Sequence, residues 1–379
     1  MLPLLFLVIL VEFPDVEFQC EPSHFQESTA EISRYFSDQS LRAYIPEFTT
    51  AGPYKLPRRS TYYGANSPTG PSDVRCHQMI ADACAAADAD PDVDFARFDA
   101  DEDGVVDNVI VIYAGYPESS YGGPDAMWPH PGSLTAEAPS TPCLVDGTLV
   151  IDGYITTSEL YEIDTPDGIG YLVHELAHSL GLPYLYDVAD PFATYTPADW
   201  SVMDSGCYAD GSSTPLGMSA YERHALGWLT PRPLNQPGNY ILGALPQYGE
   251  AYRVNGVSKN DFYLIENRQP EGWDAFIPQA GLNAWHISYD ADAWEEGRVN
   301  TASCQHVARI PVDSLLIADV EQLPSGAVTF TYHGYDALES PSADAPSGSL
   351  PQYDVMGRRL TEPRRGVLTI GKDTKTILF

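Results

Sequence analysis

The chain opens with a nearly unbroken apolar run, residues 1–13, which ends at Pro14-Asp15. The run is too short to span a bilayer. It also lacks the basic flank and the small-residue cleavage site of a signal peptide, because the first Lys or Arg of the chain is Arg34. The pattern therefore predicts a strand that is buried on both faces, and no signal peptide in this chain.

Helical and strand periodicities alternate through the following two hundred residues. We expect helices over 24–42, 72–89, 165–180 and 214–229, strands over 109–115 and 150–155, and a turn-rich segment over 43–67. From about residue 232 the pattern changes to short strands and turns, over 239–242, 251–254, 262–268, 282–287 and 328–332. In this part structural salt bridges are a better explanation than a second calcium site for five polar residues, Glu266, Arg268, His286, Asp290 and Asp292.

These patterns divide the chain into four parts. We expect an α/β domain over 1–231, in which a mixed sheet accompanies the helices, and a β-rich accessory region over 232–333. Residues 334–352 are rich in Ser, Pro, Ala, Gly and acidic residues, as in a linker. A C-terminal β segment over 353–379 completes the chain.

Composition limits the classes of function. The net charge is −33, from 53 acidic and 20 basic residues, which argues against partners such as nucleic acid or an anionic membrane. No apolar stretch is long enough for a membrane span. The six cysteines show no Cys-x-x-Cys spacing, so a cysteine zinc cluster is not expected. Nothing in the composition indicates an oligomer, and a monomer is the default expectation.

The helix expected after Thr165 contains His-Glu-x-x-His, with His174, Glu175 and His178. Positions i and i+4 share a face of a helix, so both imidazoles can bind one zinc ion. Glu175 lies beside the first histidine, where a carboxylate can act as general base toward a water molecule. Gly181 follows at the spacing of metzincin-like enzymes, and Met203 lies where a methionine turn beneath the metal would be expected.

An acidic loop precedes the strand expected over 109–115. Its pattern is Asp-x-Asp-x-Asp-Gly-x-x-Asp, with oxygen ligands at Asp99, Asp101, Asp103 and Asp107 and with Gly104 at the sharp turn. Position 12 of an EF-hand would be Ile110, so the loop matches only the first part of that motif. We expect it to bind calcium, with an ordinary acidic turn as the alternative.

Three segments carry a resemblance to a known family. His174–Asp187, Trp200–Gly206 and Ser219–Leu229 are similar to the corresponding segments of the immune inhibitor A family of secreted zinc metalloproteases, and the likeness extends from about residue 5 to about residue 310. It implies a metzincin-like metalloprotease catalytic domain with a zinc-binding helix. It also implies that the first strand of that domain begins this chain, so that an upstream signal and pro-segment are missing. A protein or peptide substrate and a secreted or cell-surface location follow from the same resemblance.

The third zinc ligand is the point at which the chain departs from the family. The family has aspartate in Leu-Pro-Asp-Leu-Tyr-Asp, where this chain has Tyr184. A neutral phenol is a poor zinc ligand near pH 7. We therefore favour Asp187, with Tyr184 or another carboxylate such as Asp190 as alternatives.

The C-terminal segment carries a second resemblance. Residues 353–359 and 365–370 resemble the β-rich sorting modules of type IX secretion, and the alternative is a small β-appendage with a basic face. The sequence as a whole predicts a secreted zinc-dependent endopeptidase. The alternative, motivated by Tyr184, is a secreted binding or adhesion protein that kept the protease fold and lost turnover.

Overall fold

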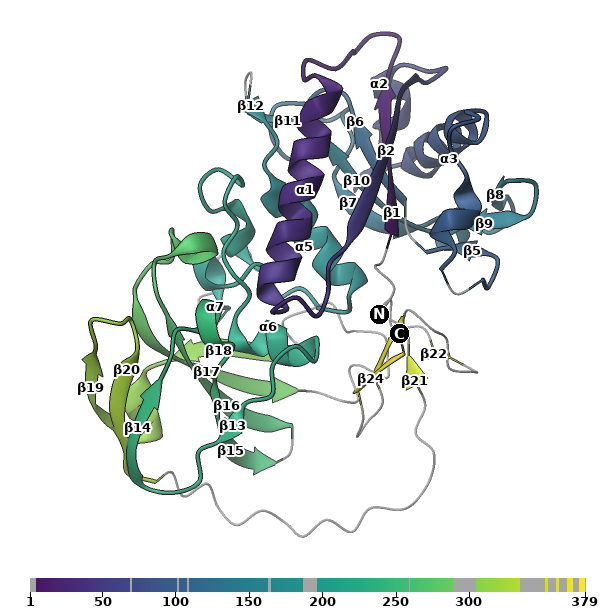
Figure 1. Cartoon of the computed structure of the whole chain (residues 1–379). Helices are drawn as coiled ribbons and strands as arrows, with labels where there is room; N and C mark the ends of the chain where they lie inside the picture. Colours follow the sequence, from purple (N-terminus) through teal and green to yellow (C-terminus); the bar gives the residue numbers. More distant parts are fainter. Residues whose placement is uncertain are drawn as a thin grey trace. The chain divides into compact units, whose positions relative to one another are not determined.

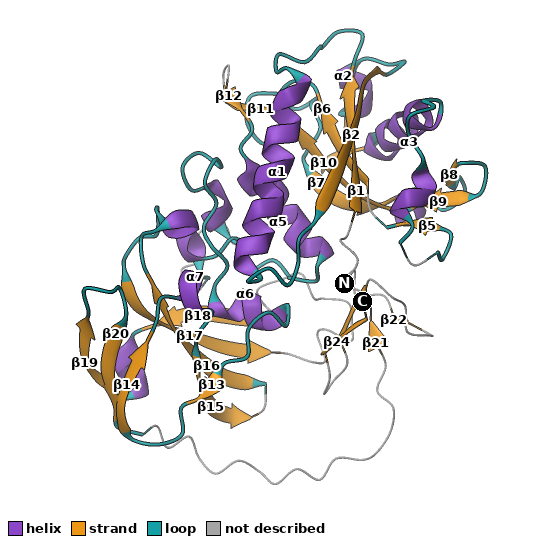
Figure 2. Cartoon of the chain, viewed as in Figure 1, coloured by secondary structure: helices purple, strands orange, loops and turns teal. Residues whose placement is uncertain are grey.

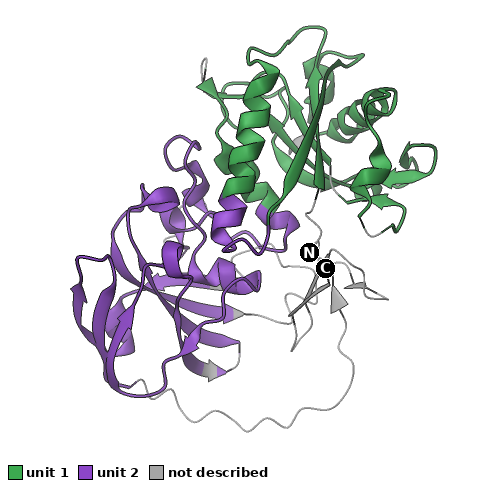
Figure 3. Ribbon diagram, viewed as in Figure 1, with its two compact units in different colours: residues 1–34, 45–176 green, residues 35–44, 177–379 purple. Residues whose placement is uncertain are grey.

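The computed structural model of the chain describes residues 5–68, 70–100, 102–107, 109–162, 165–186, 196–258, 260–289 and 305–334, and four short strands between 352 and 378. The chain divides into two compact units, residues 1–34 with 45–176 and residues 35–44 with 177–379 (Figure 3). Two of the three boundaries fall inside helices, α1 (Pro22–Gln39) and α5 (Ile169–Ser179), and the third, between residues 44 and 45, falls in the segment between α1 and β2. The division at residue 231 that the sequence suggests stays a prediction.

The first unit is built on a five-stranded sheet in the order β2-β1-β6-β10-β7 (Figures 1 and 2). Its first four strands are parallel, and β7 pairs antiparallel with β10 at the edge. The strands are β1 (Leu5–Glu12), β2 (Glu47–Lys55), β6 (Val109–Tyr113), β7 (His130–Ser133) and β10 (Gly153–Ser158). The predicted strand at the start of the chain is thus confirmed, and it lies near the centre of the sheet.

The core explains why β1 reads as an unbroken apolar run. Leu7, Ile9 and Val11 of β1 belong to one buried cluster with Met79 and Ile80 of α3 (Cys76–Asp88). The alternate residues of β1, Phe6, Val8 and Leu10, are equally buried and point to the opposite face. In Figure 1, α3 lies on one side of the sheet, and α1 and α5 lie on the other. A strand covered on both faces has no polar side.

The smaller elements of the first unit are short. They are α2 (Ser60–Tyr63), α4 (Leu134–Glu137), η1 (Phe95–Phe98), β3 (Asn66–Ser67), β4 (Gly70–Asp73), β5 (Val105–Val106), β8 (Cys143–Val145), β9 (Leu149–Ile151), β11 (Leu160–Glu162) and β12 (Thr165–Pro166). The strands β5, β9 and β8 form a second small sheet, in which β9 is parallel to β5.

Three local expectations are corrected. The turn-rich segment 43–67 contains β2, a parallel edge strand. The strand expected over 150–155 is two strands in different sheets, β9 and β10, and β7 forms the edge of the main sheet next to β10. Thr165 and Pro166 pair with β11 as β12, so α5 begins only at Ile169.

The second unit contains the β-rich region that the sequence predicts. One sheet has the order β13-β15-β16-β17-β18 and another the order β14-β20-β19. Their strands are β13 (Arg232–Pro233), β14 (Gly238–Leu242), β15 (Tyr252–Ser258), β16 (Asp261–Arg268), β17 (Gly281–Tyr289), β18 (Gln305–Ile310), β19 (Ile317–Gln322) and β20 (Val328–Tyr332). The helices are α6 (Ala220–Ala225), α7 (Leu245–Tyr248), η2 (Ala198–Trp200), η3 (Ser205–Tyr208), η4 (Gly272–Asp274) and η5 (Val312–Leu315). The helix expected over 214–229 is therefore much shorter.

A fully buried ion network holds the second unit together. The guanidinium of Arg268 donates to Asp274 through both Nε and Nη2, and its Nη1 lies 3.4 Å from Oε1 of Glu266. Nη2 also donates to the Gly217 carbonyl at 2.8 Å. The structural salt bridge expected for Glu266 and Arg268 is confirmed. His286 pairs with Asp261 at 3.2 Å, whereas Asp290 and Asp292 lie outside the described residues.

The C-terminal segment contains four short strands in an antiparallel sheet of order β22-β21-β23-β24. They are β21 (Gln352–Tyr353), β22 (Arg359–Leu360), β23 (Val367–Ile370) and β24 (Lys375–Leu378). Among the described residues, no helix combines the length and apolarity that crossing a membrane requires.

Candidate metal centre

The helix α5 carries the three residues of the His-Glu-x-x-His motif. His174, Glu175 and His178 are all buried, with relative exposures of 4%, 3% and 7%. Because α5 is a single helix, the spacing of four residues places both imidazoles on one face. Buried histidines on a common helix face, next to a buried carboxyl group, form a donor set that suits zinc.

The end of α5 orients His178. Its Nδ1 lies 2.7 Å from the carbonyl oxygen of Leu182, and because a carbonyl only accepts, Nδ1 carries the proton. The Nε2 atom of the neutral ring is then the one that can bind a metal, an arrangement typical of metal-bound histidine. Gly181, with φ of 101°, allows the chain to reverse so that Leu182 N bonds to Ala177 O at 3.0 Å.

Burial raises the pKa of Glu175 to about 8, and a hydrogen bond from Tyr171 opposes this rise. Tyr171 precedes Glu175 by one helical turn, and its hydroxyl also contacts the Pro129 carbonyl oxygen at 2.5 Å. Tyr171 lies outside the His-Glu-x-x-His motif from which the site is predicted. The sequence spacing could have indicated it, because Tyr171 and Glu175 are four residues apart and such residues are neighbours on the surface of a helix.

Tyr184, the alternative third ligand, packs against His178. The two ring centroids are 4.1 Å apart and the planes meet at 67°. The ring of Tyr186 follows at 4.9 Å from that of Tyr184. Asp187, the favoured third ligand, and Asp190 lie outside the described residues, so the choice between these candidates stays open.

Met203 is fully buried, and polar groups hold its backbone. Its N–H lies 3.0 Å from Ser201 Oγ and 3.2 Å from Oε1 of Glu222, while its carbonyl accepts from Leu185 N at 3.0 Å. The Ser201 hydroxyl donates to the same Glu222 oxygen at 2.5 Å. Glu222 is a second residue that sequence reasoning missed, because its sequence signature is that of a helix cap.

The acidic loop forms a tight turn whose carboxylates bind backbone N–H groups. Asp99 accepts from Asp103 N and Gly104 N, both at 3.0 Å, and Asp107 accepts from Ala100 N at 3.0 Å. Gly104 has φ of 85°, as the sharp turn requires. Asp101 lies outside the described residues. The calcium assignment of this loop stays a prediction.

Comparison with known proteins places the chain in a family. Residues 13–229 match the model described as immune inhibitor A peptidase M6, catalytic domain. The pre-pro-metalloprotease PrtV of Vibrio cholerae serotype O1 is 24% identical over 273 residues, which cover 58% of this chain and 29% of that relative. Immune inhibitor A of Bacillus thuringiensis subsp. alesti is 28% identical over 215 residues, 50% of this chain and 30% of the relative.

The chain thus spans about a third or less of the length of the curated relatives that it matches. The family match covers more than half of this chain and includes the whole of α5 and the segment around Met203. The resemblance noted in the sequence is thereby confirmed: the chain belongs to the immune inhibitor A (M6) family of metallopeptidases.

Proposed function

We propose that the chain is a secreted zinc-dependent endopeptidase. The observation that carries this proposal is the arrangement on α5, where two buried histidines four residues apart lie on one face of the helix and a buried glutamate follows the first of them. His174 and His178 would hold the zinc ion, and the Nδ1 contact of His178 to Leu182 O supports the tautomer that this requires. Secretion is supported by the acidic composition and by the family to which the chain belongs.

The protein residues have distinct tasks in the proposed reaction. Zinc, when bound, supplies a Lewis acid that polarises the scissile carbonyl and increases the acidity of water. Glu175 accepts the proton of the attacking water and returns it to the leaving amine, so no covalent enzyme intermediate is needed. The Tyr171 hydroxyl, which donates to the Pro129 carbonyl oxygen, lies next to the carboxyl group. Met203, held by Ser201 and Glu222, would provide a rigid apolar support for the ligands.

The test is Glu175→Gln, which keeps the size of the side chain and removes the base. Zinc content should stay that of the wild type, whereas cleavage of an unstructured protein substrate should fall by at least about 10²–10⁴-fold. The matched control is Glu47→Gln, at an exposed position of β2, which should change neither. A Glu175→Gln chain that cleaves at the wild-type rate would refute the mechanism. A wild-type chain that binds zinc and never cleaves would favour the inactive binding protein instead, which the names of the relatives do not favour.

For the third ligand we propose Asp187. Asp187→Ala should lower the zinc content of the purified chain sharply. Tyr184→Phe, which retains the ring that packs on His178, should leave the zinc content unchanged. The reverse pattern would assign the ligand to the Tyr184 phenolate.

For the remaining parts we propose that the acidic loop at 99–107 binds calcium and that 353–379 is a secretion sorting module. The tight turn around Asp99 and the antiparallel sheet of β21 to β24 support these two proposals. Deletion of 353–379 should abolish export from a host with the type IX system. Unchanged export would argue for a simple β-appendage.

A further inference from the structure

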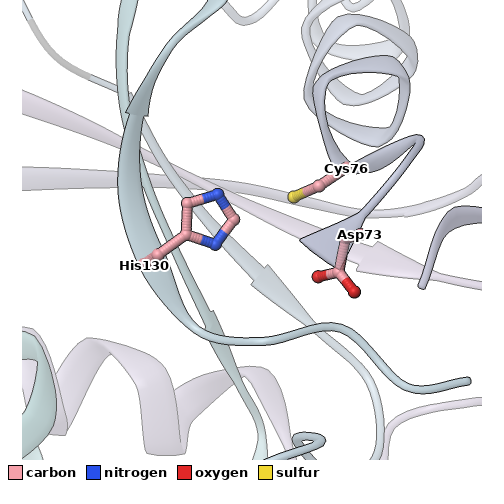
Figure 4. Close-up of side chains that lie close together, drawn as sticks. All are labelled: Asp73, Cys76 and His130. Carbon is pink, nitrogen blue, oxygen red and sulfur yellow. The ribbon is translucent and has the colours of Figure 1, made fainter. Parts of the chain in front are cut away.

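A second group of metal-ligating side chains lies in the first unit, and none of them belongs to α5. Asp73 ends β4, Cys76 begins α3 and His130 begins β7. One ligand atom of each lies within 4.8 Å of the others. Figure 4 shows the thiol, the imidazole and the carboxylate directed toward a common space. Cys76 is buried, and the other two residues are partly buried.

The hydrogen bonds of His130 leave Nε2 as the ligand atom. Nδ1 lies 2.6 Å from the Trp128 carbonyl oxygen, which only accepts, so Nδ1 carries the proton. Nε2 lies 3.0 Å from the hydroxyl oxygen of Tyr154, which also contacts Oε1 of Glu137 at 2.6 Å. A tyrosine hydroxyl has a single proton, and the shorter contact to a carboxylate takes it. The lone pair of Nε2 therefore receives no proton from Tyr154.

Asp73 adds a buried oxygen without a donor. Its Oδ2 accepts from Trp128 N at 2.8 Å, but Oδ1 is buried and has no hydrogen-bond partner among the described residues. The same holds for Oδ1 of Asn66, which pairs with Asp73 across β3 and β4, and for Oε2 of Glu118, whose other oxygen accepts from Asn66. A buried acceptor without a partner costs about 1–3 kcal/mol. Several such acceptors at one place indicate that a positive charge belongs there.

The basic residue next to the cluster does not supply that charge. The guanidinium of Arg75 donates to the Tyr62 carbonyl oxygen at 3.0 Å and lies over the Tyr62 ring, 4.6 Å from its centroid. The carboxyl groups of Glu118, near Asp73, and of Glu137, near Cys76, add negative charge to the surroundings of the cluster. A cation bound there would be attracted by carboxylates on several sides.

We propose that Asp73, Cys76 and His130 form a second metal site, for a divalent ion of the zinc class. A thiolate, an imidazole and a carboxylate together favour zinc or cobalt over calcium or magnesium, which prefer oxygen ligands alone. Two ligand atoms on one tetrahedral zinc ion are about 3.4–3.8 Å apart, so the side chains need to approach by about 1 Å. On binding, the S–H bond of Cys76 breaks, a sulfur–metal bond forms and the proton leaves to solvent, with no change of oxidation state.

Cobalt absorption tests this site without reference to proteolysis. The full chain is reduced, stripped of metal and titrated with Co²⁺ in a His174→Gln/His178→Gln variant, which lacks both helix ligands. A sulfur-to-cobalt charge-transfer band should appear in the near-ultraviolet, because Cys76 supplies a thiolate. Cys76→Ser should abolish the band. The control Cys84→Ser changes another fully buried thiol of α3, about two helical turns beyond Cys76, and should retain it.

A second variant, His130→Gln, tests the site in case Cys76→Ser does not fold. His130→Gln changes a partly buried side chain and keeps the thiol, so the circular dichroism spectrum should be unchanged while the apparent Co²⁺ affinity falls at least about tenfold. A band that persists in Cys76→Ser and disappears in Cys84→Ser would place the metal on Cys84 and its neighbour Cys143, and would overturn the proposal. The absence of any band in the parent variant would also overturn it. Neither result bears on the proposed peptidase activity.

Discussion

Glu222 connects the start of α6 to the segment around Met203, and its replacement by alanine should be strongly destabilising. The carboxylate is fully buried and accepts three hydrogen bonds, from the Ser201 hydroxyl at 2.5 Å, from Met203 N at 3.2 Å and from Ser219 N at 2.5 Å. The last of these is half of a capping box, in which Glu222 N also donates to Ser219 Oγ.

The magnitude follows from the donors that Glu222→Ala leaves without an acceptor. Met203 N keeps Ser201 Oγ as an acceptor at 3.0 Å, so the variant leaves two donors, the Ser201 hydroxyl and Ser219 N, without one. Each buried donor without a partner costs about 1–3 kcal/mol, so the loss should be about 2 kcal/mol at the least. Glu222→Gln retains one oxygen, which can still serve Ser201 and Met203, but it turns an NH₂ group toward the Ser219 N–H. We therefore expect an intermediate loss, about 1–3 kcal/mol.

Urea unfolding followed by tryptophan fluorescence and by circular dichroism measures both variants. The two signals are compared because a chain with two compact units need not unfold in one step. The matched control is Glu321→Ala, at an exposed position of β19 in the same unit, where the expected change is within about 0.5 kcal/mol. If Glu222→Ala unfolds at the same urea concentration as Glu321→Ala, these hydrogen bonds do not hold the Met203 segment.

Three further predictions concern pH, buried charge and calcium. Burial raises the pKa of Asp167 from 3.8 to about 7, so the contribution of this group to stability is complete below about pH 4 and is lost as the pH rises to 7. Relative to the wild type, Asp167→Asn should therefore gain up to about 4 kcal/mol of unfolding free energy between pH 4 and pH 7, measured by urea titration. A difference between the two proteins that does not change with pH would contradict this prediction. Arg268→Met leaves Asp274 buried without a cation and should lower the free energy of unfolding by about 3–5 kcal/mol. The control Arg232→Met removes the exposed ion pair with Glu250 and should lower it by less than about 1 kcal/mol. Calcium at a hundredfold excess over its dissociation constant should add about 2.7 kcal/mol to the wild type and little to Asp101→Ala, and equal thermal shifts would argue against the site.

The strand β1 and the helix α5 could be predicted because a local sequence pattern is enough to indicate each of them. Residues 5–11 are apolar throughout because both faces of β1 are covered. The His-Glu-x-x-His spacing is meaningful only on a helix, and the surrounding apolar residues indicate a buried one. In both cases the information lies within a dozen consecutive residues.

The missed elements depend on partners that are distant in the sequence. The β2 strand lies in the segment expected to be rich in turns and contains Gly52-Pro53. Gly52 is required there because the backbone approaches Leu10 O, 2.6 Å from the position of an added Cβ. The α6 helix ends at Ala225, well before the end of the periodic pattern. Asp73, Cys76 and His130 come from a strand, a helix and an edge strand, and no local spacing relates them.

The central position of β1 has a consequence for how the first unit forms. Leu7 of β1 pairs with Val109 of β6, about 100 residues later in the chain. At a synthesis rate of about 5–20 residues per second, β1 leaves the ribosome about 5–20 seconds before this partner. During that interval the edge of β1 that pairs with β6 lacks its partner, although α1, β2 and α3 have already been synthesised, and unpaired apolar strands are prone to aggregate. The sheet of the first unit is therefore completed only after β6 and β10 have been synthesised, through pairings over long sequence separations, which places it toward the slow end of the relation between contact order and folding rate.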